Sequence, residues 1–139
     1  MKKIILLFFC LYCGIAGATY AQPAQPATAA DATGPQFKFK DGDTFDFGEV
    51  PLGPDAMHDF VFTNVGKQPL LITDAKPSCS CTTPVWPKEA IEAGKTGVIN
   101  VGFHAAKAGP FYKEVFIQSN AYIPSGDKRY TIYIKGTVK

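Results

Sequence analysis

Short runs of hydrophobic residues alternate with polar residues at a period of two from Gln36 onward. This period is typical of β-strands with one buried face, because successive side chains of a strand point to opposite sides. By contrast, no segment of ten residues shows the spacing of an amphipathic helix. The hydrophobic positions of these runs are Phe45 and Phe47, then His58, Phe60 and Phe62, then Leu70 and Ile72, then Ile99, Val101 and Phe103, then Val115 and Ile117, and finally Tyr130, Ile132, Ile134 and Val138.

Turn-forming residues separate these runs within a stretch of roughly 100 residues, which is the usual size of one domain. About seven short strands joined by such turns predict an all-β fold, an antiparallel β-sandwich of the immunoglobulin-like class. We expect Pro77, Pro84, Pro87, Gly94 and Gly97 to lie between strands, since proline cannot donate a hydrogen bond to a β-ladder. The alternate aromatic and aliphatic side chains would form the core, each contributing about 1.5–3 kcal/mol when fully buried.

The first 21 residues carry the pattern of a secretory signal peptide. Lys2 and Lys3 precede an apolar run over residues 4–11, and small residues follow this run. The run is too short to span a bilayer, so we expect a cleavable peptide that leaves no transmembrane anchor. The small residues place the cleavage site after Ala18 or after Ala21.

Two of the four cysteines lie inside this predicted signal peptide. A lipoprotein signal needs a small residue directly before its cysteine, whereas Phe9 precedes Cys10 and Tyr12 precedes Cys13. We therefore expect both cysteines to be discarded with the peptide.

Residues 22–35 are rich in Pro, Ala and Thr and show no hydrophobic period. Such a segment cannot bury enough apolar surface to offset the entropy lost on ordering. The sequence therefore predicts a flexible spacer over 22–35 and a folded domain over 36–139. Together with the signal peptide, this organisation predicts an exported protein of the periplasm or the cell surface.

The charge balance argues against a nucleic acid as partner. Lys and Arg number 14 and Asp and Glu number 12, and Lys2 and Lys3 are lost with the signal peptide, which leaves 12 of each sign. Phosphate binding requires clustered Lys and Arg. The remaining lysines, including Lys107 and Lys113, are scattered among acidic residues, and we interpret them as a solvated surface.

Two stretches of the domain resemble known families. Residues 60–70, FVFTNVGKQPL, resemble the F-x-F-x-N-x-G-x-x-P-L hairpin of ASH/HYDIN-type immunoglobulin-like domains, which are relatives of the major-sperm-protein and pilus-chaperone sandwiches. Within this hairpin, Asn64 and Gly66 are residue types that tolerate the positive φ of a tight turn.

The second resemblance is to a family of short secreted bacterial proteins, common in Bacteroidetes-type organisms and defined only as a domain of unknown function. It covers about residues 45–138 and implies an immunoglobulin-like fold and an exported location, but no reaction. The family usually shows Cys-Gly-Cys where this chain has Ser80 between the cysteines, which reduces the backbone freedom there. The stretches that carry the likeness are SCSCT at 78–82, WPK at 86–88, GKTG at 94–97 and Ser119-Asn120.

Cys79 and Cys81 are the cysteines that remain after signal cleavage. In an extended segment their side chains would point to the same face, with Cα atoms about 6.5–7 Å apart, which is long for a disulfide. A bond between them therefore requires a bent backbone, which Pro77 and Pro84 would favour. A strained bond of this kind would be more oxidising and more easily reduced than a structural disulfide.

Four roles are open for this pair. In an oxidising compartment it can form a local disulfide that only fixes a turn. Alternatively, it can exchange with a partner protein, capture Cu(I) or another soft metal, or pair with a cysteine of another chain. Further metal ligands are lacking, because His58 shares a strand face with Phe60 and Phe62 and is expected to be structural. His104 ends a strand and is expected to be solvated.

Two other motifs invite a functional interpretation. Trp86, bracketed by Pro84 and Pro87, is a candidate binding anchor, since Trp is enriched at interaction hot spots. The interpretation we favour is that it covers one end of the sandwich or packs against the cysteine pair. Asp41 and Asp43 form a D-x-D pair that can touch calcium, but the remaining oxygen ligands are missing, which favours a hydrophilic turn.

The motifs of common enzymes are absent from the chain: it has no G-x-S-x-G, no H-E-x-x-H, no phosphate-binding glycine loop and no cofactor fingerprint. We therefore expect no enzyme and no cofactor. The leading hypothesis is an exported, non-catalytic interaction or structural module of the bacterial cell envelope, which contacts other envelope proteins through its loops or by strand addition at a sheet edge. The alternative is a periplasmic thiol-redox or copper-handling protein that uses Cys79 and Cys81. No oligomeric state is predicted.

Overall fold

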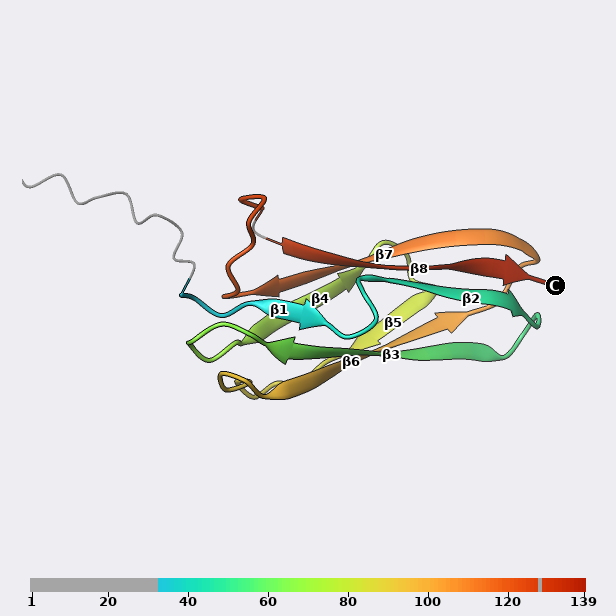
Figure 1. Cartoon of the computed structure of the whole chain (residues 1–139). Coiled ribbons are helices and arrows are strands. Elements are labelled where there is room, and N and C mark those ends of the chain that lie inside the picture. The colour runs from blue at the N-terminus through green and yellow to red at the C-terminus, as the bar shows by residue number, and fades with distance from the viewer. Residues whose placement is uncertain (1–32, 128) are drawn as a thin grey trace, which may run out of the picture.

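The computed structural model describes residues 33–127 and 129–139, which fold into an all-β sandwich of eight strands. Sheet A has the strand order β1-β3-β6-β5 and sheet B the order β2-β8-β7-β4. Figure 1 shows them as two layers, with β7 and β8 of sheet B above β3 and β6 of sheet A. The strands are β1 (Phe37–Phe39), β2 (Thr44–Val50), β3 (Asp55–Asn64), β4 (Ile72–Pro77), β5 (Thr82–Val85), β6 (Thr96–His104), β7 (Gly109–Ser119) and β8 (Arg129–Val138).

The signal peptide predicted for residues 1–21 and most of the predicted spacer lie outside the described residues. The part of the spacer that is described packs against the domain, because Gly34 and Pro35 are buried there. Residues just ahead of Gln36 therefore also take part in the packing of the domain. The described residues contain no helix with the length and hydrophobicity needed to cross a membrane.

The immunoglobulin-like sandwich predicted from the sequence is confirmed, with one difference in strand direction. The neighbouring strands of both sheets pair antiparallel except β2 and β8, which run parallel, with Thr44 opposite Tyr133 and Val50 opposite Val138. The difference arises because the first strand is split. β1 pairs with β3 in sheet A, and residues 40–43 then carry the chain to sheet B, where β2 lies beside β8.

Three residues expected between strands lie inside strands instead. Pro77 ends β4 and Pro84 lies in β5, and both strands are at sheet edges, where one side of the backbone has no ladder to complete. Gly97 lies in the central strand β6, where a Cβ atom would come within 2.4 Å of the Phe62 ring. This glycine is required by the packing of an aromatic ring and not by a turn.

The core lies between the inner faces of the two sheets and contains most of the alternating residues that the sequence analysis named, together with Val50, Ala75 and Ala105. Sheet A contributes Phe60, Phe62, Ile99, Val101 and Phe103, and sheet B contributes Ile72, Val115, Ile117, Ile132, Ile134 and Val138, all of them buried. Phe45, Phe47 and Tyr130 are half-buried at the margin of this core. The period of two therefore predicted the buried face of each long strand correctly.

Asn64 and Gly66 fix the beginning of β1 by a different mechanism from the predicted one. The fully buried Asn64 side chain accepts hydrogen bonds from the N–H groups of Gln36 and Gly66 and donates to the carbonyls of Gln68 and Ile91. Gly66 does not have a positive φ. A Cβ atom there would lie 2.0 Å from the carbonyl oxygen of Gly34, so the close approach of two backbone segments requires the glycine.

Candidate functional site

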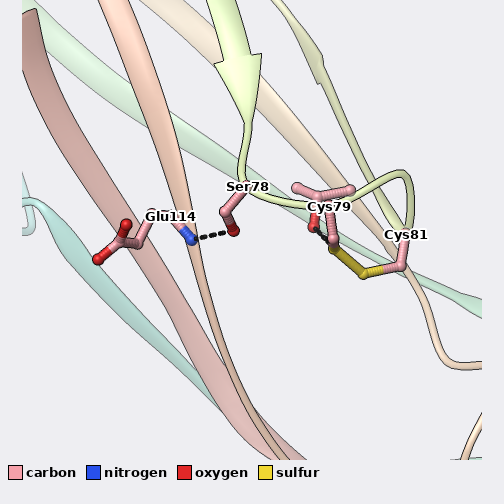
Figure 2. The surroundings of a disulfide bond; sticks show 5 residues. Ser78, Cys79, Cys81 and Glu114 are labelled. Atoms are coloured by element: carbon pink, nitrogen blue, oxygen red, sulfur yellow. Dashed lines mark hydrogen bonds between the residues drawn. A yellow bond between two sulfur atoms is a disulfide. The ribbon is translucent and has the colours of Figure 1, made fainter.

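Cys79 and Cys81 lie in the turn that joins β4 to β5 and carries the chain from sheet B to sheet A. The two residues form a disulfide bond, with their Cα atoms 5.3 Å apart. This separation is shorter than the roughly 6.5–7 Å of an extended segment, because the backbone turns at Ser80 and Cys81. Figure 2 shows the bond between the two ends of this turn.

The backbone on both sides of the disulfide is hydrogen-bonded to a sheet. Ser78 extends the pairing of β4 with β7, because its N–H donates to the Glu114 carbonyl at 2.8 Å and its Oγ accepts from the Glu114 N–H at 3.1 Å (Figure 2). On the other side, the His104 N–H donates to the Cys81 carbonyl at 2.8 Å. The turn is therefore anchored to sheet B before the disulfide and to sheet A after it.

A buried hydroxyl group lies directly against the two sulfur atoms. Thr82 is 3% exposed, and its Oγ1 is 3.6 Å from the Cys79 Sγ and 4.0 Å from the Cys81 Sγ. Because disulfide sulfur has no hydrogen to donate, the hydroxyl is the donor in this contact. The Thr82 N–H also donates to the Cys79 carbonyl at 3.3 Å, which closes the turn.

A cleft of about 350 Å³ lies beside the disulfide, and Cys81 is the cysteine that lines it. The stacked rings of Phe103 and Phe111, with centroids 3.9 Å apart, form part of its wall. Lys107 and Lys113 also line it, and neither forms an ion pair with a carboxylate of the described residues. The cleft thus combines one cysteine of the disulfide, an apolar wall and two lysines.

Trp86 lies at the other end of β5 from the disulfide, so the structure does not bring these two candidates together. Its half-buried indole packs against the core, and the Lys88 Nζ lies 3.1 Å from the centre of its ring. The buried Nε1 has no hydrogen-bond partner among the described residues. The indole therefore covers part of the core, and a lysine covers the indole.

The two histidines lie where the sequence predicted them. His58 is half-buried and stacks on Phe45 with ring centroids 3.4 Å apart, and its partial burial lowers its pKa. His104 ends β6 with an exposed ring, and its Nδ1 lies 2.6 Å from a carboxylate oxygen of Asp55. His104 also lines the cleft beside Cys81, whereas His58 lies elsewhere.

Asp41 and Asp43 lie in the exposed loop between β1 and β2, as predicted. The Asp43 side chain accepts a hydrogen bond from the Thr44 hydroxyl, and its backbone carbonyl accepts one from Tyr133. Among residues 33–127 and 129–139, no group of three or more His, Cys, Asp or Glu side chains could hold a metal ion. Copper capture by the cysteine pair stays a prediction, and it would first require reduction of the disulfide.

Sequence reasoning missed three residues of this site. It interpreted Lys107 and Lys113 as general surface, because Lys107 reaches the cleft from the β6–β7 loop and Lys113 from β7, and only the folded chain brings both beside Cys81. It gave Thr82 no role, although a hydroxyl residue directly after Cys81 could have indicated a hydrogen bond to a sulfur.

A second surface feature is the outer face of sheet A. Met57, Val85 and Val98 are 57%, 59% and 42% exposed there, and Val61 is half-buried opposite Val98. The pairing of β3, β6 and β5 places Met57 opposite Gly102 and Val85 opposite Asn100, so these side chains lie on one side of the sheet. We call Met57, Val61, Val85 and Val98 the sheet A patch.

The family described as "Protein of unknown function (DUF1573)" matches residues 37–138. No curated protein matches the chain significantly. Among solved structures, a protein of unknown function from Porphyromonas gingivalis W83 superimposes with a TM-score of 0.64 at 17% identity, covering 77% of this chain and 49% of that one. The chain thus spans about half the length of that protein.

Two further solved structures share the architecture. The ASH / PapD-like domain 7 of human CEP192 superimposes with a TM-score of 0.55 at 9% identity, covering 78% of this chain and 87% of that domain. The VesB protease of Vibrio cholerae gives 0.56 at 19% identity, covering 73% of this chain and 32% of the protease. Identities this low establish the fold alone. Together with the family match, they confirm the resemblance to ASH-type domains and to a bacterial family of unknown function.

Proposed function

The chain belongs to the family of proteins of unknown function DUF1573, and from this premise we propose that it is an exported, non-catalytic protein-interaction module of the bacterial cell envelope. The observation that carries the proposal is the sheet A patch, where large apolar side chains lie exposed on one face of a rigid sheet. Large exposed apolar side chains gathered on one face of a domain are typical of protein contact sites.

The sheet edges are less suited to binding than this face. β1 has only three residues, and β5 contains Pro84. β2 is irregular between Asp46 and Glu49, and β4 is irregular near its start and ends at Pro77. Short edges, bulges and prolines are the features that prevent another strand from pairing. We therefore place the contact on the outer face of sheet A and not at an edge.

The polar groups around the patch indicate the kind of partner. Asp55 and Asp59 are the charged residues at the outward positions of β3. Asp55 is in contact with His104, and the Asp59 carboxylate accepts a hydrogen bond from the Asn100 side chain at 2.6 Å. At the end of the same face, the hydroxyls of Thr63 and Thr96 lie 3.5 Å apart. A partner that covers the patch would bury apolar side chains and few charges, which favours an apolar surface of another envelope protein.

The experiment compares two faces of the domain. Met57→Lys/Val98→Lys places two charges on the sheet A patch, and Thr131→Lys/Tyr133→Lys places two on the outer face of sheet B. Each tagged full chain is expressed in its native host and cross-linked, and captured envelope proteins are identified by mass spectrometry. We expect the sheet A variant to lose proteins that the unchanged chain and the sheet B variant both retain.

Equal capture by the unchanged chain and both variants would contradict the proposed surface. Intact mass spectrometry of the protein from the native host tests export independently. We expect a mass that corresponds to cleavage after Ala18 or Ala21, while a chain that still carries residues 1–18 and fractionates with cytoplasmic proteins would contradict it.

A further inference from the structure

We propose that the Cys79–Cys81 disulfide is a thiol–disulfide exchange site, at which an anionic thiol enters the neighbouring cleft, attacks Cys81 and displaces Cys79. This activity is separate from the interaction function proposed above. The relevant features are the cleft on the Cys81 side, the buried Thr82 hydroxyl against Cys79 and the lysines at the cleft.

The position of the bond in the chain argues against a role as a staple alone. A disulfide stabilises a protein mainly by restricting the unfolded chain, and the effect grows with the length of the loop that it closes. Cys79 and Cys81 are two residues apart, so their bond restricts very little. The backbone hydrogen bonds of Ser78 and Cys81 already hold the turn against both sheets.

The cleft determines which sulfur is attacked. Cys81 lines the cleft of about 350 Å³, whereas Cys79 does not. An attacking thiolate must approach a sulfur atom from outside the protein, and this volume is large enough for a small thiol or the side chain of a peptide cysteine. Both cysteines are half-buried, and we assign Cys81 as the target because it is the one that borders the cleft.

Thr82 favours Cys79 as the leaving group. Exchange is faster when the departing thiolate is stabilised, because a leaving thiol of lower pKa departs more readily. The Thr82 hydroxyl is 3.6 Å from the Cys79 Sγ, closer than its 4.0 Å separation from the Cys81 Sγ. A buried hydroxyl that donates to a forming thiolate makes a charge-assisted hydrogen bond. Thr82 is thus a positioning residue that stabilises the product of the first step.

Lys107 and Lys113 select the charge of the incoming thiol. Both line the cleft, and neither is paired with a carboxylate in the described part of the chain. The third basic side chain, His104, is already in contact with Asp55. Two unpaired ammonium groups attract a negatively charged reactant, so the preferred partner is a thiol that carries a carboxylate or another anion close to its sulfur.

The reaction balances without a further reagent. The partner thiolate forms a bond to the Cys81 Sγ, the bond between Cys81 and Cys79 breaks, and Cys79 leaves with the electron pair as a thiolate. A second partner thiolate then attacks the mixed disulfide at the partner's sulfur and releases Cys81 as a thiolate. The domain gains two electrons and becomes a dithiol after protonation, and the two partner thiols are oxidised to a disulfide.

The first experiment measures how fast three small thiols reduce the oxidised full chain: 2-mercaptoethanesulfonate, which is anionic, 2-mercaptoethanol, which is neutral, and 2-mercaptoethylamine, which is cationic. Each rate is divided by that of the same thiol with hydroxyethyl disulfide, which removes differences in intrinsic reactivity. We expect the anionic thiol to be favoured over the cationic one by about tenfold at low ionic strength. No preference, or a preference for the cation, would overturn the proposal.

Charge variants locate the source of this preference. Lys107→Gln/Lys113→Gln should abolish it, whereas Lys67→Gln/Lys95→Gln, which removes the same charge away from the cleft, should leave it intact. Equal loss in both variants would show that net charge and not the cleft governs the reaction, and the proposed site would be wrong.

Thr82 and the site of attack are tested separately. Thr82→Val keeps the shape of the side chain without the hydroxyl, and we expect it to slow reduction about tenfold, since a hydrogen bond to a charged group is lost. Thr82→Ser should restore the rate, which a purely structural role would not predict. Peptide mapping after a rapid acid quench should find the first adduct on Cys81. An adduct mainly on Cys79, or a Thr82→Val chain that reacts at the original rate, would overturn the mechanism.

Discussion

Several connections carry the chain from one sheet to the other, and the two that join edge strands of both sheets, β1–β2 and β4–β5, are built differently. The β1–β2 crossing, residues 40–43, is flanked by half-buried rings that pack against the core, namely Phe37, Phe39, Phe45 and Phe47. The β4–β5 crossing, residues 78–81, contains the disulfide and contributes one half-buried cysteine to the same packing. The first crossing is held by the packing of rings against the core. The second is held by the local disulfide and by backbone hydrogen bonds to Glu114 and His104.

Because of this difference, we expect the β1–β2 crossing to contribute mainly to stability and the β4–β5 crossing mainly to reactivity. At the β1–β2 crossing, loss of one side chain removes contacts that hold two sheets together. At the β4–β5 crossing, the covalent bond closes so short a loop that the fold gains little from it, and a cleft lies beside Cys81. We therefore expect substitutions at the first crossing to affect folding and those at the second to affect reactivity.

The largest effect is expected for Asn64→Ala. This change removes the four hydrogen bonds that the buried Asn64 side chain forms with backbone groups at the start of β1 and in the neighbouring turns. Since each unsatisfied group costs about 1–3 kcal/mol and some can relax, the free energy of unfolding should fall by about 4 kcal/mol in urea denaturation. The control is Asn100→Ala, which removes one hydrogen bond at the surface and should cost less than about 1 kcal/mol. Equal losses for the two variants would contradict this account of Asn64.

Phe39→Ala should have the next largest effect. The Phe39 ring lies 5.2 Å from the ring of Tyr130 and 5.8 Å from that of Phe62, measured between centroids. Because the ring is only half-buried, we expect a loss of about 2 kcal/mol in the free energy of unfolding. Tyr112→Ala, which removes an exposed ring from sheet B, serves as the control and should change stability by about 0.5 kcal/mol or less. If Phe39→Ala lowers the free energy of unfolding no more than this control does, ring packing does not hold the β1–β2 crossing.

Removal of the disulfide should cost less than either of these changes. For Cys79→Ser/Cys81→Ser, the loop-entropy relation gives a loss of about 1.5 kcal/mol, and the far-ultraviolet circular dichroism spectrum should remain that of a β-sandwich. The same urea titration provides the measurement. A loss larger than that of Asn64→Ala would reverse the comparison and make the disulfide the main support of its crossing.

The smallest effect concerns the pH dependence of His58 beside the β1–β2 crossing. Burial lowers the pKa of His58 in the folded chain below its ordinary value of 6.5, so the unfolded chain binds the proton more readily. The contribution of neutral His58 to the free energy of unfolding is therefore fully present above pH 6.5. It declines as the pH falls from 6.5 toward the lowered pKa. His58→Phe should lose less stability between pH 7.5 and 5.5 than the unchanged chain, and identical slopes in urea titrations would contradict this.

The long strands could be predicted from the sequence because their alternation directly reports burial. β3, β6 and β8 follow the period of two over nine or ten residues, and their buried positions agree with the core. β1 and β5 were not identified, because three or four residues carry too little pattern and Pro84 argues against a strand. The parallel direction of β2 was also missed, since alternation does not indicate which neighbour a strand pairs with.

The candidate site was only partly predictable. The spacing of Cys79 and Cys81 indicated both a possible disulfide and the bend that it needs. The positions of Lys107, Lys113 and Thr82 around it depend on the packing of a loop and on distances between side chains, which a local pattern does not contain. Gly66 shows the same limit, because its role depends on the approach of Gly34, a contact between segments far apart in sequence.

The parallel pairing of β2 with β8 also constrains the timing of folding. Thr44 pairs with Tyr133, so sheet B lacks a partner for β2 until nearly the whole domain has been synthesised. At the usual speed of translation this interval lasts roughly 5–20 seconds, and strand pairs so distant in sequence also close slowly. A nascent chain that holds β2 without β8 therefore has an incomplete sheet B throughout this interval.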